Sequence, residues 1–298
     1  MKIKLETIQK PCSTISNAVD VNSISQLTEV LELETKDDVL QLSVTNKEYF
    51  VTINIPVDDP EEIHATVDAE LFTKLISRIT TEYVELSVTD KFLVVKGNGT
   101  YRLPLIFEDS VMMTLPRIEV NNISSEFDVS SDVLNSIMTA NSRQLDVGVI
   151  SNAVQKYFYI DQHGALTFTS GATVNNFDLG ADIKLLLNAR LVKLFKLFEN
   201  EQVHICYGTE PLSDEIIQTR ISFTTPKVRL SAILSCDDTM LKSVPVNRIR
   251  SLASDELPYT VSIPRNKLLE ALERFSLFSQ DAMLSSACLD FEREFVKV

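Results

Sequence analysis

Glycine is scarce in this chain: only 7 of its 298 residues are glycine. Neither common type of glycine-rich phosphate-binding loop is present, since both need glycines at fixed spacing next to a helix. This absence argues against the usual nucleotide-binding enzymes. One small cluster, Gly97-Asn98-Gly99, lies between two strand-like runs and predicts a hairpin turn.

Cysteine is rare as well, and the four cysteines, Cys12, Cys206, Cys236 and Cys288, are far apart in the sequence. No C-x-x-C pair occurs, so the sequence predicts neither a zinc site nor a disulfide framework. Free thiols fit a reducing cytoplasm. The segment MKIKLETIQKP lacks the apolar stretch of a secretory signal, and no run approaches a membrane span. We therefore expect a cytoplasmic protein with no metal, no cofactor and no membrane contact.

Residue types that carry out catalysis are not grouped in the sequence. The three histidines, His64, His163 and His204, are isolated from one another, and the run Ser130–Asp132 is typical of a helix N-terminus. The sequence thus predicts no catalytic residue and no enzyme. Two alternatives stay open: an α+β adaptor that binds proteins, and an enzyme whose site forms only in three dimensions.

What the sequence does contain is an amphipathic helix followed by a strand, over residues 188–207. Asn188 suits the N-cap position. The apolar face that follows at helical spacing consists of Leu191, Val192, Leu194, Phe195, Leu197 and Phe198. Arg190, Lys193 and Lys196 recur every three residues and form a basic stripe. Cations on a solvated helix face are the competing interpretation of this stripe.

The same pattern occurs earlier, over residues 68–88, with Asp68 as the cap and Lys74 and Arg78 on the polar side. Its apolar positions are Leu71, Phe72, Leu75, Ile76 and Ile79. The two occurrences are roughly 120 residues apart, which is the size of a whole domain rather than of a solenoid repeat. The sequence therefore predicts an internally repeated protein.

Taken in order, the periodicity predicts an α+β fold in which each repeat has the order βαβββ–αβββ, with two helices on a curved antiparallel sheet. The expected domains are residues 1–122, residues 123–255, and the start of a third copy over residues 256–298. Pro11 predicts that the first helix starts late or is bent. Leu268, Leu272, Phe275 and Phe278 would lack the second helix of a complete copy. We therefore expect either that the native chain continues past Val298 or that the protein pairs in a different way.

Three stretches resemble the bacterial DNA sliding clamp, the β subunit of DNA polymerase III. They are ISQLTEVLELETKDDVLQLSVTNKEYFVTINI, LVKLFKLFENEQVHI and ISFTTPKVRLSAIL. The resemblance covers the whole chain in order, and a divergent, phage-encoded member would account for the acidity and the few glycines. It implies a ring of repeated domains, with helices inside and sheets outside, that encircles duplex DNA and tethers the replicative polymerase. A homodimer is implied if the third domain is complete.

The resemblance assigns DNA contacts to cations on the helices. A sliding protein needs many phosphate contacts and no base contacts, and lysine and arginine supply them. The formal net charge of −14 opposes DNA binding unless the acidic residues lie on the sheets and loops, away from the helices that face DNA. The candidates are Lys10, Lys74, Arg78, Arg143, Arg190, Lys193, Lys196, Lys267 and Arg274.

The family also has a pocket that receives short peptide motifs from polymerases and the clamp loader. Its segments correspond here to GATVNNF, at residues 171–177, and DTMLKSV, at residues 238–244. The charged and histidine members of the family's first motif are absent from GATVNNF, and what the two segments share with the family is apolar character. The resemblance therefore proposes, as the partner-peptide pocket, Val174, Phe177, Met240, Leu241 and Val244. Ordinary packing at a domain junction is the alternative.

Overall fold

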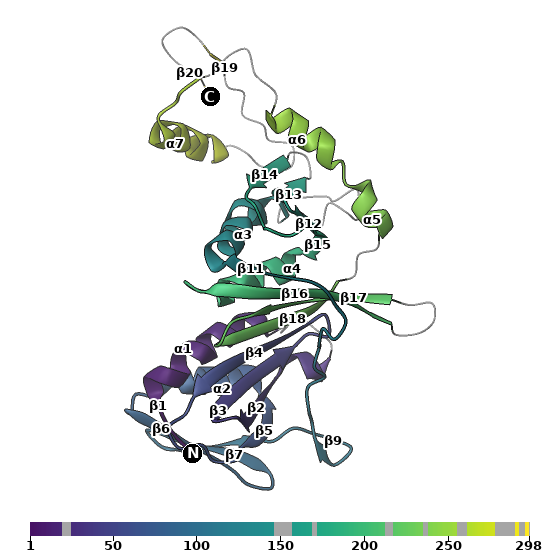
Figure 1. The fold of residues 1–298 in the computed structure, drawn as a ribbon. Helices are drawn as coiled ribbons and strands as arrows, with labels where there is room; N and C mark the ends of the chain where they lie inside the picture. The colour runs from purple at the N-terminus through teal and green to yellow at the C-terminus, as the bar shows by residue number, and fades with distance from the viewer. Residues whose placement is uncertain are drawn as a thin grey trace.

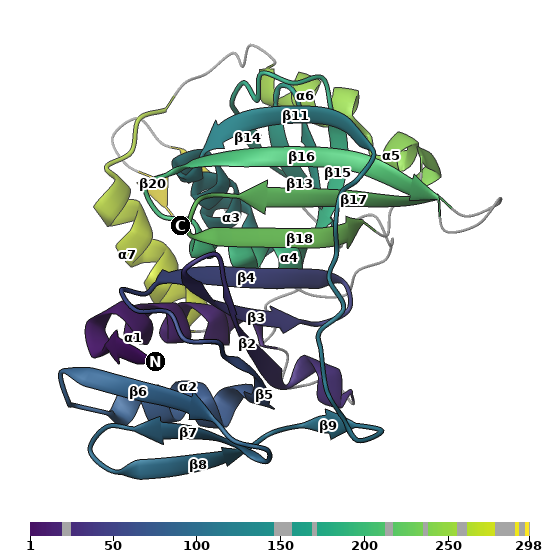
Figure 2. The same cartoon turned by 60° about the horizontal axis from the view of Figure 1, so that its bottom comes forward.

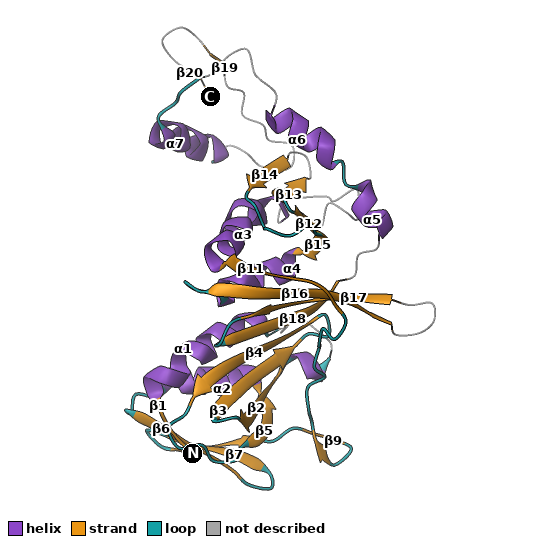
Figure 3. Cartoon of the chain, in the orientation of Figure 1, coloured by secondary structure: helices purple, strands orange, loops and turns teal. Residues whose placement is uncertain are grey.

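A computed structural model describes residues 1–19, 25–145, 157–168, 172–211, 217–234, 238–254, 261–277, 290–291 and 296–297. Its strands form antiparallel sheets, and the helices lie beside them (Figures 1 and 3). The fold is α+β, as the sequence predicts. In the described part of the chain, no helix is both long and apolar enough to cross a membrane.

The first repeat is built from eight strands and two α-helices. In chain order they are β1 (Lys2–Lys4), α1 (Leu5–Ile15), β2 (Val30–Lys36), β3 (Val39–Thr45), β4 (Tyr49–Pro56), β5 (His64–Asp68), α2 (Ala69–Arg78), β6 (Tyr83–Val88), β7 (Phe92–Lys96) and β8 (Thr100–Pro104). Single 3-10 turns lie at Ser16–Ala18 and Gln26–Thr28. A small hairpin of β9 (Phe107–Glu108) and β10 (Val111–Met112) precedes the connection to the next repeat.

The second repeat has the same elements in the same order. They are β11 (Ile123–Ser130), α3 (Ser131–Leu145), β12 (Tyr157–Asp161), β13 (Gly164–Phe168), β14 (Ala172–Asn176), β15 (Lys184–Asn188), α4 (Ala189–Lys193), β16 (Gln202–Pro211), β17 (Ile217–Thr224) and β18 (Val228–Leu234). The elements after it are α5 (Asp238–Ser243), α6 (Val246–Ser254), α7 (Arg265–Ser276), β19 (Asp290–Phe291) and β20 (Val296–Lys297).

Strand pairing confirms the internal repetition. In the first repeat the strands pair in the orders β1-β6-β7-β8 and β4-β3-β2-β5, and in the second in the orders β11-β16-β17-β18 and β14-β13-β12-β15. Each repeat thus contains one strand more than the predicted βαβββ–αβββ order. The additional strands are β5 and β15, and each runs directly into a helix.

The two repeats share one sheet. Strand β18 pairs with β4 in antiparallel register, with Val228 opposite Ile53 and Ala232 opposite Tyr49. This pairing merges half of each repeat into an 8-stranded sheet, which Figure 2 shows with β4 next to β18. Buried side chains of both repeats form one continuous apolar core behind it. The junction is therefore made of main-chain hydrogen bonds and packed side chains.

Local sequence explains where the helices begin. The Asp68 carboxylate accepts a hydrogen bond from the Leu71 N–H at 2.7 Å, and the Asn188 side chain accepts one from the Leu191 N–H at 2.7 Å. Both predicted caps are confirmed. The first helix starts at Leu5 and contains Pro11, so the predicted late start is wrong. Since Pro11 lacks an N–H, this helix misses one internal hydrogen bond.

The helix predicted from residue 188 is shorter than expected. The α-helix ends at Lys193, and a 3-10 segment, Leu194–Leu197, continues it. All six predicted apolar residues, Leu191, Val192, Leu194, Phe195, Leu197 and Phe198, are nevertheless buried. In the first repeat, Phe72, Ile76 and Ile79 are buried as predicted, but Leu71 is 52% exposed.

Candidate functional site

A cleft of about 940 Å³ lies beside the second repeat, between strands β12 and β15, strands β11 and β16, and the α5–α6 segment. Helices α5 and α6 follow the second repeat directly, and Figure 1 shows them beside its strands. Ser125 and Tyr207 contribute from β11 and β16, Asp161 from β12, and Leu241 and Val244 from the helical segment.

Four of the five residues predicted for the peptide pocket lie together here. Val174, Met240, Leu241 and Val244 belong to one apolar cluster, whose remaining buried members are Tyr159, Leu166, Leu186 and Ile249. Leu241 and Val244 line the cleft, whereas Val174 and Met240 pack in the cluster without lining it. Phe177 lies elsewhere, because it packs against the main core. The structure thus brings part of the predicted set to a concave surface.

The polar side of the cleft contains an ion pair that sequence reasoning missed. Arg250 on α6 donates two hydrogen bonds to Asp161 on β12, Nη1 to Oδ2 at 2.8 Å and Nη2 to Oδ1 at 2.6 Å. The carboxylate also accepts from the His163 N–H at 2.9 Å. These two elements are far apart in the sequence and carry no local pattern that links them, so no sequence signal could have found the pair.

This ion pair controls ionisation inside the cleft. Burial raises the pKa of Asp161, but the hydrogen bonds from Arg250 and His163 outweigh burial and hold the pKa below its ordinary value. Burial, reinforced by the negative Asp161, raises the pKa of Tyr159 to about 12. The Asp161 carboxylate is therefore charged and Tyr159 neutral at physiological pH, and Arg250 fastens α6 to the sheet.

Further cations surround the cleft. Lys184, Lys242 and Arg248 line it and are exposed. Among the described residues, the Arg250 Nε is buried without a hydrogen-bond partner. An unpaired buried donor costs free energy, which offsets part of what the ion pair with Asp161 contributes. The cleft thus combines a small apolar surface with a charged rim, which includes these cations and the exposed carboxylate of Asp182.

The predicted DNA-binding cations lie on the helices of three segments of the chain. Lys10 lies on α1, Lys74 and Arg78 on α2, Arg190, Lys193 and Lys196 on α4 and the 3-10 segment after it, and Lys267 and Arg274 on α7. All eight are exposed. Arg143 belongs to α3, but its side chain lies outside the described residues. Figure 1 shows α1, α2, α3 and α4 beside the sheets of their own repeats, with α7 apart from both.

Some of these cations already have partners within the chain. Lys10 Nζ is 2.6 Å from a carboxylate oxygen of Glu199, and Lys74 forms an ion pair with Glu70 one turn earlier. Lys196 donates a hydrogen bond to the Asn17 side chain at 2.9 Å. The Lys10 and Lys196 contacts join the first repeat to the second. These cations therefore offer less free positive charge than the sequence suggests.

Carboxylates also gather where the two repeats meet, which sequence reasoning did not anticipate. Glu199 and Glu201 follow the 3-10 segment, and Lys227 Nζ lies 2.6 Å from a carboxylate oxygen of Glu201. The hydrogen bond from Lys227 lowers the pKa of Glu201, against a smaller opposing effect of burial. The junction between the two repeats thus carries charges of both signs.

Comparison with known proteins gives a result at the level of structure alone. No protein-family model matches the chain, and no curated protein matches its sequence. Among solved structures, the β subunit of the DNA polymerase of Streptococcus pyogenes has a TM-score of 0.72 at 14% identity, over 94% of this chain and 75% of that one. The DNA polymerase III β chain of Streptococcus pneumoniae has a TM-score of 0.71 at 12% identity, over 93% of this chain and 73% of that one.

A third solved structure, the DNA polymerase III β subunit of Thermotoga maritima, has a TM-score of 0.69 at 14% identity, again over 93% of this chain and 73% of that one. Similarity at this identity establishes the fold. With its duplicated strand order and the shared sheet between the repeats, the chain therefore has the fold of the bacterial DNA polymerase III β subunit, the sliding clamp.

Proposed function

We propose that this protein is a DNA sliding clamp, a processivity factor that encircles duplex DNA and tethers a replicative polymerase to it. The observation that carries the proposal is the duplicated architecture: two repeats with identical strand order join edge to edge, and helices of both carry exposed cations. In this function the protein is a scaffold and not an enzyme. Topology, rather than tight binding, keeps it on DNA.

The proposal includes the organisation predicted from sequence. Residues 1–122 form clamp domain 1, residues 123–255 clamp domain 2, and residues 256–298 belong to a third domain. If that domain is complete in the native protein, two chains form the ring. The protein works in the cytoplasm, which fits thiols without disulfide partners at Cys12 and Cys206.

DNA contact is proposed for the exposed helix cations, and the contacts are to phosphates of any sequence. Arg78 and Lys193 are the residues to test, because both are exposed and they lie on the corresponding helices, α2 and α4, of the two repeats. We expect Arg78→Glu with Lys193→Glu to weaken binding to all duplexes alike and to lower the slope of log K against log salt by about 2, since each phosphate contact contributes about 0.9.

The measurement is fluorescence anisotropy of labelled duplexes of several sequences over a series of salt concentrations. Lys36→Glu, at an exposed position in a hairpin rather than on a helix, is the matched control and should leave the slope unchanged. Retention on nicked circular DNA, with loss after the circle is cut, would support encirclement. Equal slopes for the helix double variant and the control would remove the helix assignment.

Partner binding is proposed for the cleft beside α5 and α6, through short peptide motifs of the polymerase and the clamp loader. Its apolar surface suits a peptide with apolar residues near its C-terminus, and a few buried anchors dominate such sites. Val244 is 6% exposed and lines the cleft. Val244→Asp should abolish binding of a synthetic peptide that ends in leucine and phenylalanine.

Leu71→Asp is the matched control for this experiment, because Leu71 is exposed on α2 and does not line the cleft. Circular dichroism of both variants checks that the fold is intact. A peptide that binds equally well to both variants, or crosslinks outside the cleft, would contradict the assignment. DNA binding is tested separately, so the two halves of the proposal can fail independently.

A further inference from the structure

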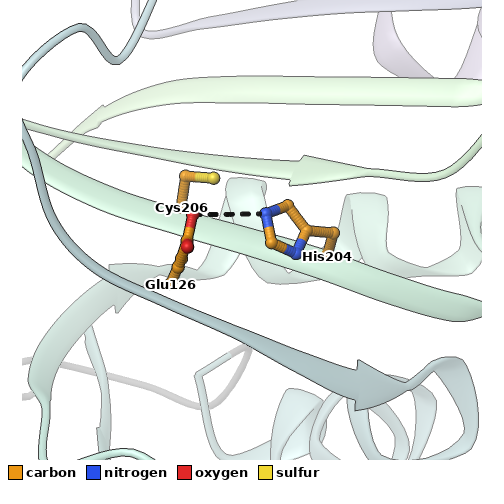
Figure 4. A group of neighbouring side chains, drawn as sticks. All are labelled: Glu126, His204 and Cys206. Atoms are coloured by element: carbon orange, nitrogen blue, oxygen red, sulfur yellow. Dashed lines mark ion pairs between the residues drawn. The ribbon is translucent and has the colours of Figure 1, made fainter.

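Strands β11 and β16 bring two pairs of metal-binding residue types together on one face of the long sheet. In their antiparallel register Glu126 lies opposite Cys206, and Asp128 lies opposite His204. Residues two apart on a strand point to the same side, so all four side chains share one face. Figure 4 shows the side chains of Glu126, His204 and Cys206 next to one another on this strand pair.

The distances suit a shared ion. One donor atom each from Glu126, His204 and Cys206 lies within 4.8 Å of the other two. The His204 Nε2 is 3.8 Å from a carboxylate oxygen of Glu126. Zinc bonds to oxygen, nitrogen and sulfur are about 2.0–2.3 Å long, so the donor atoms of a tetrahedral zinc site lie somewhat closer together than the 4.8 Å limit found here. Small side-chain rotations close the difference.

Asp128 supplies a second feature of a metal site. Its Oδ1 lies 3.0 Å from the His204 Nδ1, so the carboxylate accepts the Nδ1–H hydrogen bond. The neutral ring then carries its lone pair on Nε2, the nitrogen that faces Glu126. A carboxylate that holds a histidine in this tautomer is the usual outer partner of a histidine bound to zinc. The other face of the strand pair is fixed by packing, since Val203, Ile205 and Val129 are buried.

We propose that Glu126, His204 and Cys206 bind a zinc ion, with Asp128 as the residue that positions His204. A donor set of one thiolate, one imidazole and one carboxylate favours zinc over magnesium or calcium, which take oxygen ligands. Three protein donors leave one tetrahedral position for water. The site is on the surface, because His204 is 45% and Glu126 63% exposed.

The sequence predicted no zinc site, because the cysteines form no local pair and the donors come from two strands that only folding brings together. The site is also separate from the proposed clamp surfaces. Ser125 and Tyr207, which line the cleft, are the immediate neighbours of Glu126 and Cys206 and point to the opposite face. Zinc here would tie together the strand pair that forms one wall of the cleft.

The test is metal binding by the full chain, purified without a histidine tag. Competition with a chromophoric chelator should give one tightly bound zinc per chain. Cobalt in its place should show the charge-transfer absorption of a cobalt–thiolate bond and the intense visible bands of a tetrahedral ion. Cys206→Ser should remove the thiolate absorption, and His204→Gln should weaken binding of both metals.

Asp128→Asn separates positioning from ligation. It should weaken zinc binding by about 10–100-fold while the cobalt–thiolate absorption remains. The matched control is His64→Gln, because His64 Nε2 lies 3.4 Å from a carboxylate of Glu32 on a neighbouring strand, as His204 lies near Glu126. The control should not change binding. The proposal is overturned if the wild-type chain binds no zinc, or if Cys206→Ser binds it as tightly as the wild type.

Discussion

Replacing Arg250 with leucine should destabilise the segment that closes the cleft by about 3 kcal/mol. The Asp161 side chain is 9% and the Arg250 side chain 23% exposed, and two short hydrogen bonds join them. Removing one partner of a buried ion pair costs roughly 3–5 kcal/mol, because the other charge stays buried without compensation. Solvent still reaches Arg250, so the lower end of this range applies.

The pH dependence follows from the pKa of Asp161. In the wild type this pKa lies below the ordinary value of 3.8, so the pair contributes its full stability above that pH and loses it as pH falls through the lowered pKa. In Arg250→Leu, the hydrogen bonds and the positive charge of Arg250 no longer oppose burial, so the pKa of Asp161 rises relative to the wild type. The loss of stability in Arg250→Leu, relative to the wild type, should therefore be largest at neutral pH. It should shrink as the solution is acidified towards about pH 4.

Hydrogen exchange measured by mass spectrometry is the suitable assay, because it reports the free energy of opening of α6 separately from unfolding of the repeats. Arg248→Leu is the matched control: Arg248 is an exposed neighbour on the same helix, and its replacement should change stability by less than about 0.5 kcal/mol. A double-mutant cycle with Asp161→Asn isolates the coupling. Equal protection of α6 in Arg250→Leu and Arg248→Leu would refute this account of the cleft.

Three further outcomes are expected. Phe195→Ala should cost about 3–5 kcal/mol in urea denaturation, because Phe195 is fully buried with its ring centroid 5.1 Å from that of Phe223. Asp68→Ala should cost about 1 kcal/mol by the same assay, since the Leu71 N–H loses its cap, and Asp68→Asn should restore most of it. Cys12 should resist thiol reagents in the native protein, because it is buried and burial raises its pKa to about 12; mass spectrometry that found rapid labelling at pH 8 would contradict its position in the core.

Much of the fold could be predicted because its signals are local. The caps at Asp68 and Asn188 and the apolar helix faces are properties of short segments. The turn at Asp37-Asp38 is also local: both residues adopt positive φ, 48° and 62°, as aspartate tolerates in tight hairpins. Duplication of these signals then revealed the repeat.

Strands β5 and β15 were missed for a physical reason. Each runs into the next helix with no glycine or proline between them, and the last residue of the strand is also the helix cap, Asp68 in one repeat and Asn188 in the other. The cap signal therefore obscured the strand. The switch to 3-10 geometry after Lys193 was missed because two turns are too few to separate a period of 3.0 from one of 3.6.

The candidate sites were less predictable because their partners are distant in sequence. The resemblance to the clamp family predicted that Met240, Leu241 and Val244 lie near Val174, and the structure brings these four together. Phe177 has the same character but faces the main core. The pairing of Asp161 with Arg250, and that of Lys10 with Glu199, depends on how the second repeat meets its neighbours, which no local pattern encodes.

The pairing of β18 with β4 joins two unlike sheet edges. Strand β18 is the last strand in the order β11-β16-β17-β18, whereas β4 is the first strand in the order β4-β3-β2-β5. Among the described strands, β8 and β14 are the equivalents of these two edges, and each has a neighbour on one side only. A contact between unlike edges can be repeated without limit, and each repetition adds the same rotation. Repeats that associate in this way must either close into a ring or grow into an open filament. The twist at this single strand pair decides which of the two forms.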